Sequence, residues 1–270
     1  MQSPTRSSDD VAATSATRRP PLVRLTDIGK RFGNGTVALA GLNLDIGRHE
    51  FVSLLGSSGC GKSTALRLIA GLAAPSSGSI EWNGDASANS RGKDIGFVFQ
   101  EPTLMPWASV RDNVRLPLRL QHRDDAQPEV DDALAMVGLT GFARAYPREL
   151  SGGMKMRASI ARALVTRPQL LLMDEPFAAL DEITRIRLNN DLLELWQSHS
   201  WTVAFVTHSV YESVYLSNRI VVMAASPGRI VAEHVIDAPY PRDEEFRTSA
   251  RYNEYCRLVS KSLAAAMDEA

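Results

Sequence analysis

The feature that most restricts the fold of this chain is a glycine-rich loop between an apolar run and a helical pattern. The loop, Gly56-Ser57-Ser58-Gly59-Cys60-Gly61-Lys62-Ser63, matches the spacing G-x-x-x-x-G-K-[ST] in full. The short apolar run Glu50–Leu55 precedes it, and Lys62–Leu72 carries apolar residues at helical spacing. Glycines let the backbone turn successive N–H groups inward, and the helix adds the positive end of its dipole. The loop therefore predicts a cradle for the phosphates of a nucleoside triphosphate.

Two side chains of this loop have expected tasks. Lys62 is expected to reach the β- and γ-phosphates, and the Ser63 hydroxyl is expected to coordinate Mg²⁺. A chance glycine turn is the alternative, but the strand before the loop and the helix after it are the context that the motif requires. The remaining expected nucleotide contacts in the loop are Gly56, Ser57, Ser58, Gly59, Cys60, Gly61 and Thr64.

A second apolar run, Leu170–Met173, ends in the carboxylates Asp174 and Glu175. A buried strand that ends beside the phosphate loop would place Asp174 where it can hold Mg²⁺ through water. Glu175 follows directly and is expected to polarise the attacking water as a general base. Taken alone, an Asp-Glu pair after a strand is more often a helix cap or a turn, and the complete phosphate loop reverses that preference.

Composition and charge exclude several other classes of protein. The chain has 270 residues, of which 44% are hydrophobic, and its 30 basic and 31 acidic residues give a net charge of −1. No broad basic field is available for nucleic acid, so no nucleic-acid partner is expected. No apolar run is long enough to cross a bilayer, and two cysteines are too few for a disulfide framework. A reducing cytosolic compartment is expected.

The order of apolar runs and turns predicts strands that alternate with helices, and hence a mostly parallel sheet covered on both faces. The strands are expected over Leu22–Leu25, Leu42–Ile46, Glu50–Leu55, Ser79–Trp82, Asp94–Phe99, Leu170–Met173 and Thr202–Val206, followed by a hairpin over Ile220–Met223 and Arg229–His234. A helix is expected over Thr184–Gln197.

Three regions differ from this alternating pattern of strands and helices. Residues 1–20 are rich in Ser, Thr, Ala and Arg and are expected to form a disordered tail, with a transit peptide as the weaker alternative. Residues 101–166 contain helical segments, such as Glu129–Val137 and Met154–Val165, separated by prolines, which indicates an inserted helical subdomain. Residues 241–270 carry aromatic residues among charges and suggest a terminal amphipathic helix. The main domain is therefore expected over 21–240.

The stretch Leu150-Ser151-Gly152-Gly153-Met154 stands before an expected helix and upstream of Asp174. By itself it would be an N-cap with a flexible entry. In a chain with a phosphate loop, it resembles the signature motif of the ABC (ATP-binding cassette) family, in which Gln is usual where this chain has Met154. The resemblance extends over about Leu22 to His234. It implies a P-loop NTPase core of the RecA-like α/β class, with an antiparallel β subdomain and an inserted helical subdomain.

The resemblance also implies roles for residues outside the phosphate loop. Phe32 stands where the family has an aromatic residue that stacks on adenine, and Val37 would add apolar contact to the base. Gln100 matches the glutamine that senses Mg²⁺ and the attacking water. His208, after the run Thr202–Val206, matches the switch histidine that contacts the γ-phosphate. Ala179-Leu180-Asp181 matches a loop that crosses the dimer interface.

The family architecture implies that two cassettes dimerise head to tail. Ser151, Gly152 and Gly153 of one subunit would then face the ATP bound to the other subunit. ATP would close the dimer, and hydrolysis at Glu175 would release it. The partner cassette is expected to be a second copy of this chain or a similar cassette.

A transporter subunit is the first hypothesis for the function. Leu104, Met105 and Trp107 would form part of a groove for a permease helix, although packing inside the subdomain is equally compatible with each of them. The runs Ser109–Val114 and Pro176–Asp181 resemble the nitrate, sulfonate and taurine branch of ABC importers. That branch pairs two cassettes with two membrane permease subunits and a solute-binding protein. Importers of pyrimidine precursors are similar to it, so they remain an alternative for the substrate. The chain is then expected at the cytoplasmic face of the inner membrane, powering uptake of a small anion.

The main alternative is a soluble ABC ATPase of DNA repair or translation. Repair ATPases carry long coiled coils before the signature, and Thr103–Arg148 is too short and too rich in proline for one. Translation factors carry two cassettes in one chain, whereas this chain has one. A P-loop kinase would leave Ser151–Met154 and His208 unexplained. A degenerate, binding-only cassette is disfavoured because the expected catalytic residues Lys62, Gln100, Glu175 and His208 are all present.

Overall fold

The computed structural model describes residues 21–84, 95–123, 125–199 and 201–268. The expected disordered tail, residues 1–20, lies outside the described residues, as does Asp94 at the start of one expected strand. Within the described segments, no helix is both long enough and apolar enough to span a membrane.

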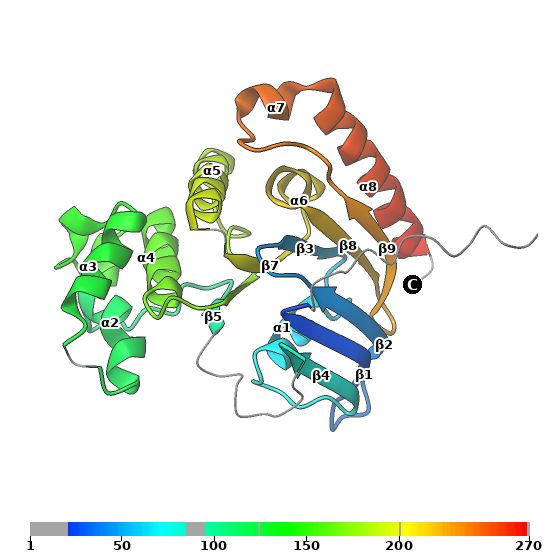
Figure 1. Ribbon diagram of the computed structural model, residues 1–270, viewed down its shortest axis with the longest axis horizontal. Helices are drawn as coiled ribbons and strands as arrows, with labels where there is room; N and C mark the ends of the chain where they lie inside the picture. Colours follow the sequence, from blue (N-terminus) through cyan, green and yellow to red (C-terminus); the bar gives the residue numbers. More distant parts are fainter. Residues whose placement is uncertain (1–20, 85–94, 124, 200, 269–270) are drawn as a thin grey trace, which may run out of the picture.

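A six-stranded sheet forms the centre of the molecule, with the strand order β5-β6-β7-β3-β8-β9 (Figure 1). The first five strands of this order pair in parallel, and β9 runs antiparallel to β8. The mostly parallel sheet and the terminal hairpin expected from the sequence are therefore confirmed. The strands are β3 Phe51–Gly56, β5 Ile95–Val98, β6 Leu170–Asp174, β7 Thr202–Thr207, β8 Arg219–Ala224 and β9 Arg229–Val235.

A second, three-stranded sheet is antiparallel throughout and has the order β2-β1-β4. Its strands alternate between buried and exposed residues over parts of their length, as expected for a sheet with one solvated face. This sheet is the antiparallel subdomain that the family resemblance implied. Its strands are β1 Val23–Arg31, β2 Val37–Ile46 and β4 Ser77–Trp82.

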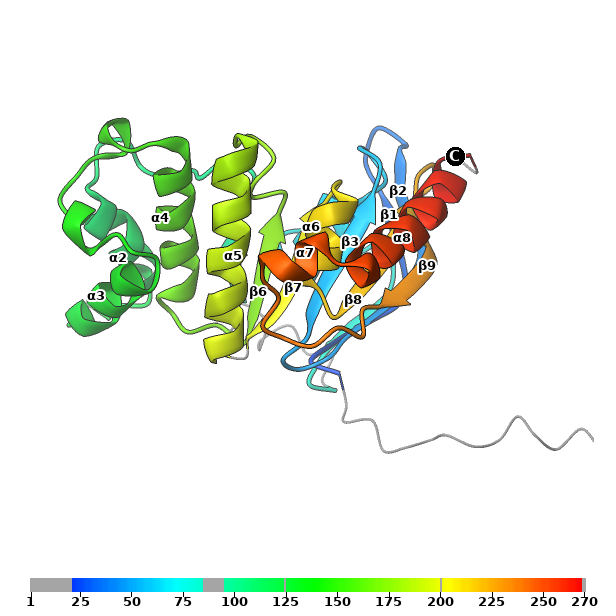
Figure 2. The same ribbon diagram turned by 90° about the horizontal axis from the view of Figure 1, so that it is seen from above.

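Helices cover both faces of the central sheet. Helix α1 (Lys62–Ile69) lies between the two sheets, whereas α5 (Glu182–His199), α6 (Val210–Leu216) and α8 (Ala250–Asp268) lie on the opposite face (Figures 1 and 2). The alternation of side chains along β3 explains this division. Phe51 and Leu55 belong to the core cluster under α5, α6 and α8. Val52 and Leu54 of the same strand belong to the cluster that contains α1 and the antiparallel sheet, so all of β3 is buried.

Helices α2 (Val110–Leu120), α3 (Gln127–Met136) and α4 (Gly152–Leu164) form a group at one side of the sheet, next to α5 (Figures 1 and 2). Their place in the sequence corresponds to the inserted helical region. The sequence did not predict α2, because Pro117 interrupts its helical pattern. The proline lies within the last turn of α2, and Ser109 caps the other end through a hydrogen bond from the Asp112 N–H at 3.1 Å.

The end of the chain, α7 (Glu244–Thr248) and α8, packs on the core rather than projecting from it. Tyr252, Cys256 and Val259 of α8 are buried, and α8 contacts α6 and β8. Burial raises the pKa of the Cys256 thiol to about 11, so this cysteine packs as a neutral side chain. The expected amphipathic helix is thus present and covers the core.

Arg242 fastens this end of the chain to α6. Its buried guanidinium donates hydrogen bonds to five backbone carbonyl groups, three of them at the end of α6, where the helix dipole favours a cation. The acceptors are the carbonyl oxygens of Val214, Tyr215, Ser217, Ile236 and Ala238. The ring of Tyr240 stacks under the guanidinium at 4.2 Å.

Candidate functional site

The glycine-rich loop connects β3 to α1 and curls over the carboxyl end of the central sheet. Gly59 and Gly61 have φ values of 82° and 92°, a region that glycine enters without steric cost. A methyl group at Gly61 would lie 2.9 Å from the carbonyl oxygen of Ala38, so the loop and β2 approach too closely for any side chain there. Gly61 is also the N-cap of α1, which directs the first N–H groups of the helix toward the loop.

Lys62 lies across this loop with 4% of its surface exposed. Its ammonium group donates hydrogen bonds to the carbonyl oxygens of Gly56 and Ser57, each at 2.9 Å. Cys60 is fully buried beneath it, and burial raises the pKa of its thiol. A neutral thiol leaves Lys62 as the charged group of the loop that is available to phosphate oxygens.

Ser63 and Asp174 meet at the end of β6. The Ser63 hydroxyl donates a 2.7 Å hydrogen bond to Oδ1 of Asp174, which joins the phosphate loop to the second motif predicted from the sequence. Burial raises the pKa of the Asp174 carboxyl. A nearby cation would offset that effect by favouring the ionised form.

Glu175 follows Asp174 in a left-handed backbone conformation, with φ of 46°. Its N–H donates to the carbonyl oxygen of Val206 on β7, which holds the turn against the sheet. Its carboxylate lies between two basic groups: Oε1 is 3.9 Å from Nζ of Lys62, and Oε2 is 3.4 Å from Nδ1 of His208. His208 is 54% exposed and so remains accessible to a ligand.

Lys62, Ser63 and Glu175 border a cavity of about 530 Å³, a size typical of small-molecule sites. Five other expected site residues lie next to these groups but do not line the cavity, namely Gly56, Ser57, Cys60, Asp174 and His208. The cavity is lined by ten of the residues expected from the sequence, namely Phe32, Val37, Ser58, Gly59, Gly61, Lys62, Ser63, Thr64, Gln100 and Glu175. The phenyl ring of Phe32 is 44% exposed at its rim, with Nζ of Lys30 at 5.5 Å from its centre. An open aromatic ring above a phosphate-binding loop is suited to stacking on a purine.

Three residues that line this cavity were not expected from the sequence. Thr36 and Ala38 of the β1–β2 turn and strand line it beside Val37, and Ser226 enters from the turn between β8 and β9. Thr36 and Ala38 flank Val37, an expected site residue, so their position in the sequence could have indicated them. Nothing in the sequence around Ser226 indicates a ligand, because its turn is formed by the pairing of strands distant from the loop.

Ser151, Gly152 and Gly153 do not line this cavity. They form the N-terminus of α4, where the Ser151 hydroxyl accepts a 3.3 Å hydrogen bond from the Met154 N–H. The two glycines instead fit closely against the loop and helix that follow Glu175. A methyl group at Gly152 would lie 3.3 Å from Cδ2 of Leu180, and one at Gly153 would lie 2.8 Å from Cγ2 of Thr184.

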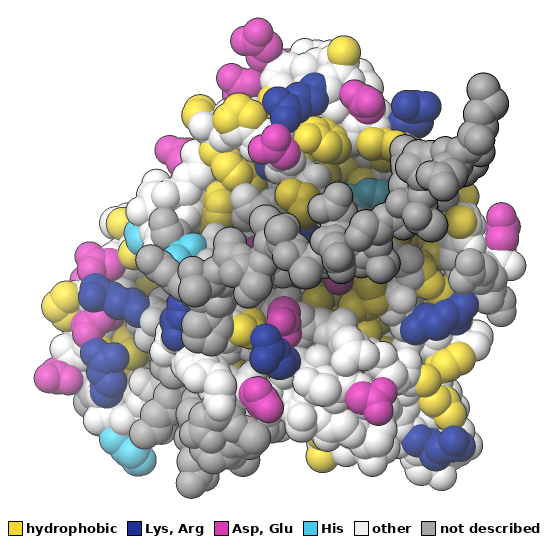
Figure 3. All heavy atoms as spheres, turned by 45° about the vertical axis from the view of Figure 1, so that its right-hand side comes forward, with side chains coloured by type: hydrophobic (Ala, Val, Ile, Leu, Met, Phe, Trp, Pro, Cys, Tyr) yellow, Lys and Arg dark blue, Asp and Glu magenta, His cyan; other side chains and the backbone are white. Residues whose placement is uncertain are grey.

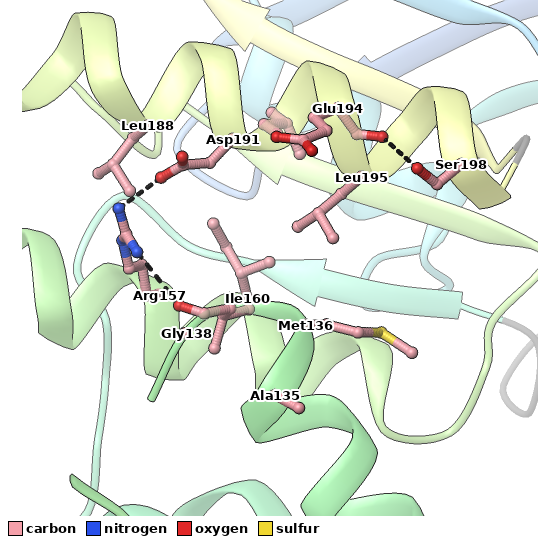
Figure 4. Close-up of a pocket in the computed structure, with 12 residues that line it drawn as sticks. Ala135, Met136, Gly138, Arg157, Ile160, Leu188, Asp191, Glu194, Leu195 and Ser198 are labelled. Atoms are coloured by element: carbon pink, nitrogen blue, oxygen red, sulfur yellow. Dashed lines mark hydrogen bonds and ion pairs between the residues drawn. The ribbon is translucent and has the colours of Figure 1, made fainter. Parts of the chain in front are cut away.

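A second contact holds α4 against α5. Arg157, one turn along α4, bonds Asp191 of α5 at 2.5 Å and the carbonyl oxygen of Val137 at 3.3 Å (Figure 4). Arg157, Asp191 and Val137 line a cavity of about 280 Å³ between α3, α4 and α5. The cavity shares no lining residue with the one around the phosphate loop.

The segment after β5 carries Gln100 and the apolar residues considered for a partner surface. Arg162 of α4 holds this segment by donating to the carbonyl oxygens of Pro102 and Thr103, each at 2.8 Å. Trp107 is 75% exposed, whereas Leu104 is half-buried against the core. The sequence left open whether these residues are exposed to a partner or packed inside the subdomain. Trp107 is exposed, and Leu104 is packed against the core.

Comparison with known proteins identifies the family. The family model described as "ABC transporter" matches residues 39–178. The chain belongs to the ABC transporter family. A putative ATP-binding protein of Brucella abortus is 47% identical over 234 residues, which cover 86% of this chain and 89% of that protein. The aliphatic sulfonates import ATP-binding protein SsuB of Bacillus subtilis is 45% identical, over 78% of this chain and 82% of SsuB.

A solved structure supports the same assignment. The ATP-binding cassette MJ0796, in a dimeric post-hydrolysis state bound to ADP and Pi, superposes with a TM-score of 0.70 and 32% identity. The match covers 80% of this chain and all of MJ0796. As a member of this family, the chain is an ATP-binding subunit of an ABC transporter and an ATPase.

Proposed function

We propose that the cavity around the phosphate loop binds ATP with Mg²⁺, and that Glu175 activates the water that attacks the γ-phosphate. The arrangement of Glu175 between Lys62 and His208 carries this proposal. A carboxylate held beside the groups that contact the terminal phosphate is placed to accept a proton from water. His208 and Lys62 would stabilise charge that develops on the phosphoryl oxygens.

The residues present fit a magnesium ion. Ser63 and Asp174 offer adjoining oxygen donors, and Gln100 lines the cavity together with Ser63. Mg²⁺ prefers such oxygen ligands and retains several waters alongside phosphate oxygens. When bound, the metal would neutralise charge on the β- and γ-phosphates.

The position of the signature residues supports a head-to-tail dimer. Ser151, Gly152 and Gly153 are absent from the cavity of their own chain, yet they present a helix N-terminus suited to an anion. A second cassette facing the first would bring them to the γ-phosphate of the partner. The structure of MJ0796 is dimeric, which is a precedent for pairing of two cassettes. The partner would be a second copy of this chain or a similar cassette.

A cleft of about 440 Å³ next to the Gln100 segment is our candidate for the permease contact. Its lining includes the stacked rings of Phe97 and Phe99, Leu116 and the 73% exposed Leu120. An apolar groove of this kind is suited to an amphipathic helix from an integral membrane permease. The chain would then sit at the cytoplasmic face of the inner membrane, and a solute-binding protein would act through the permease.

For the transported solute, we favour a sulfonate or a similar small anion such as nitrate or taurine. The support is the likeness to SsuB, which is named for aliphatic sulfonate import. No residue of a cassette needs to contact the solute, so the residues of the site carry no further information about it. Loss of the chain from its host should abolish growth on an alkanesulfonate as sole sulfur source while leaving growth on sulfate unchanged. Unaffected growth on the sulfonate would contradict this assignment.

The hydrolytic mechanism is tested by Glu175→Gln, which keeps the size of the side chain and removes its basicity. We expect ATP turnover to fall by about 10³-fold or more, and an ATP-bound dimer to accumulate in size-exclusion chromatography. A variant that stays monomeric with ATP would contradict the dimeric mechanism, and one that still turns over would contradict the role of Glu175. Failure to co-purify with a membrane permease from detergent-solubilised membranes would contradict the proposed permease contact.

A further inference from the structure

The turn that carries His208 is held from both sides by one buried hydroxyl group. Thr207, the last residue of β7, is 2% exposed. Its Oγ1 donates a 2.5 Å hydrogen bond to Oε2 of Glu212 and accepts a 3.0 Å hydrogen bond from the Ser209 N–H. The residues before and after His208 are therefore joined through this oxygen, which limits the directions in which the imidazole can point.

Glu212 is the next member of the same network. It lies on α6 and is 9% exposed, so its charge needs a partner close by. Within the described chain, Oε1 of Glu212 has no hydrogen-bond partner, and the same is true of Nε of Arg185 on α5. These two atoms face each other at 3.9 Å. The guanidinium of Arg185 thus supplies the charge that balances Glu212.

Arg185 extends the network to the loop after Glu175. Its Nη2 donates a 2.8 Å hydrogen bond to the carbonyl oxygen of Leu180. Leu180 belongs to the Ala179–Asp181 loop, and its side chain approaches Gly152 of the signature helix. A continuous path of polar contacts therefore runs from this loop through Arg185, Glu212 and Thr207 to the turn at His208.

The residues of this path enclose a small gap beside Glu175 and His208. Its walls include Glu175, Phe177, Arg185, His208 and Glu212, and it has no room for a water molecule. In the intact protein, these groups therefore contact one another directly and not through a bridging water. The same gap borders both Glu175 and His208, so a shift of its wall would change the distance between the two groups.

We propose that Arg185, Glu212 and Thr207 are positioning residues for ATP hydrolysis. They hold the His208 turn at a fixed distance from Glu175 and tie that distance to the position of the Leu180 loop. None of the three lines the nucleotide cavity, so they act on turnover and not on ATP affinity. The inference rests on the proposed roles of Glu175 and His208.

The decisive comparison is between two substitutions at one position. Thr207→Val keeps the shape and branching of the side chain but removes the hydroxyl, whereas Thr207→Ser keeps the hydroxyl. We expect Thr207→Val to lower kcat by about tenfold, the lower end of the effect of residues that orient catalytic groups, with the KM for ATP changed by less than about twofold. Thr207→Ser is expected to remain within about threefold of the unchanged protein.

Arg185→Gln and Glu212→Gln test the remaining steps, with the exposed Arg187→Gln and Glu254→Gln as matched controls. Both network variants should lower kcat without weakening the binding of a fluorescent ATP analogue, and the controls should not. Because Arg185 and Thr207 act through one path, the double variant Arg185→Gln with Thr207→Val should lose about as much activity as the worse single variant.

Several outcomes would overturn the inference. It fails if Thr207→Val keeps full turnover, if Thr207→Ser is as impaired as Thr207→Val, or if the losses in the double variant multiply. It also fails if the loss appears in KM and ATP affinity rather than in kcat. Glu175→Gln, measured alongside, separates this failure from failure of the proposed function, since full turnover in that variant would remove the role on which the network depends.

Discussion

A single methyl group at Gly153 is expected to displace the signature helix from the loop after Glu175. The added Cβ would lie 2.8 Å from Cγ2 of Thr184 and 3.9 Å from Cδ1 of Leu188. The first contact is about 0.6 Å shorter than the 3.4 Å at which ordinary van der Waals contact begins. Gly153 lies in helical conformation within α4, so alanine meets no backbone strain there. Steric contact with Thr184 is therefore the main effect of Gly153→Ala.

Two opposing contributions keep the change in the free energy of unfolding small. Overpacking of a well-packed contact costs about 1–3 kcal/mol. Replacement of glycine by alanine within a helix returns about 0.5–1 kcal/mol. The net loss of about 0–2.5 kcal/mol leaves the protein folded, with the melting temperature lowered by about 2–4 °C for each kcal/mol in a domain of this size. A shift of about 0.5 Å in α4 is expected to lower turnover about tenfold, since misplacement by 1 Å can cost 10²-fold.

The assay is steady-state ATP hydrolysis together with thermal unfolding of Gly153→Ala, alone and combined with Thr184→Ser. The serine removes Cγ2, keeps the hydroxyl, and leaves in place the 2.9 Å hydrogen bond from the backbone N–H of residue 184 to Oδ1 of Asp181. We expect the double variant to recover most of the lost turnover, and Thr184→Ser alone to behave like the unchanged protein. If the serine restores nothing, contact with Thr184 is not how Gly153 positions the helix.

Three further predictions concern buried polar groups. Burial raises the pKa of Asp174 in the folded, nucleotide-free protein. The protonated carboxyl therefore stabilises the fold at a pH below its ordinary pKa of about 4, and this stabilisation is lost as the pH rises through the raised pKa. Asp174→Asn should therefore raise the melting temperature of the nucleotide-free protein at pH 7 by about 2–4 °C, a gain that shrinks near pH 4, while removing the stabilisation by Mg²⁺ with ATP; a lower melting temperature at pH 7 would contradict this. Arg162→Ala should lower the free energy of unfolding in urea by about 2 kcal/mol, because it removes charge-assisted bonds to Pro102 and Thr103, and a loss equal to that of the exposed control Arg119→Ala would count against the contact. Arg242→Ala should cost about 3 kcal/mol by leaving five carbonyl acceptors without their donor, and it should speed hydrogen exchange in α8 before the rest of the core; uniform exchange would refute the local role.

The sequence predicted the elements whose residues carry local signals. Every strand of the central sheet follows an apolar run, and Gly56–Ser63 determines the loop between β3 and α1 by its own spacing. The meeting of Ser63 with Asp174 was also expected, because both follow parallel strands that end at the same edge of the sheet.

What the sequence could not predict depends on contacts between distant segments. Ser226 reaches the nucleotide cavity only because β8 lies beside β3 and the hairpin turn folds back over the loop. The network around Glu212 joins α5, α6 and β7, and no spacing within the sequence relates Arg185 to Thr207. The short helix α6 was missed because it has seven residues, fewer than a periodic pattern needs to be recognised.

The left-handed backbone of Glu175 has a consequence for mutagenesis at this position. A residue other than glycine pays about 1–3 kcal/mol in this region, with asparagine and aspartate the least affected and β-branched residues the most. In a saturation library, the yield of folded protein should therefore rank glycine and asparagine high and valine, isoleucine and threonine low, whatever their activity. The ranking of these variants by protein yield would then differ from their ranking by ATP hydrolysis. Yield depends on how well each residue adopts the left-handed backbone, whereas hydrolysis depends on whether its side chain carries a carboxylate.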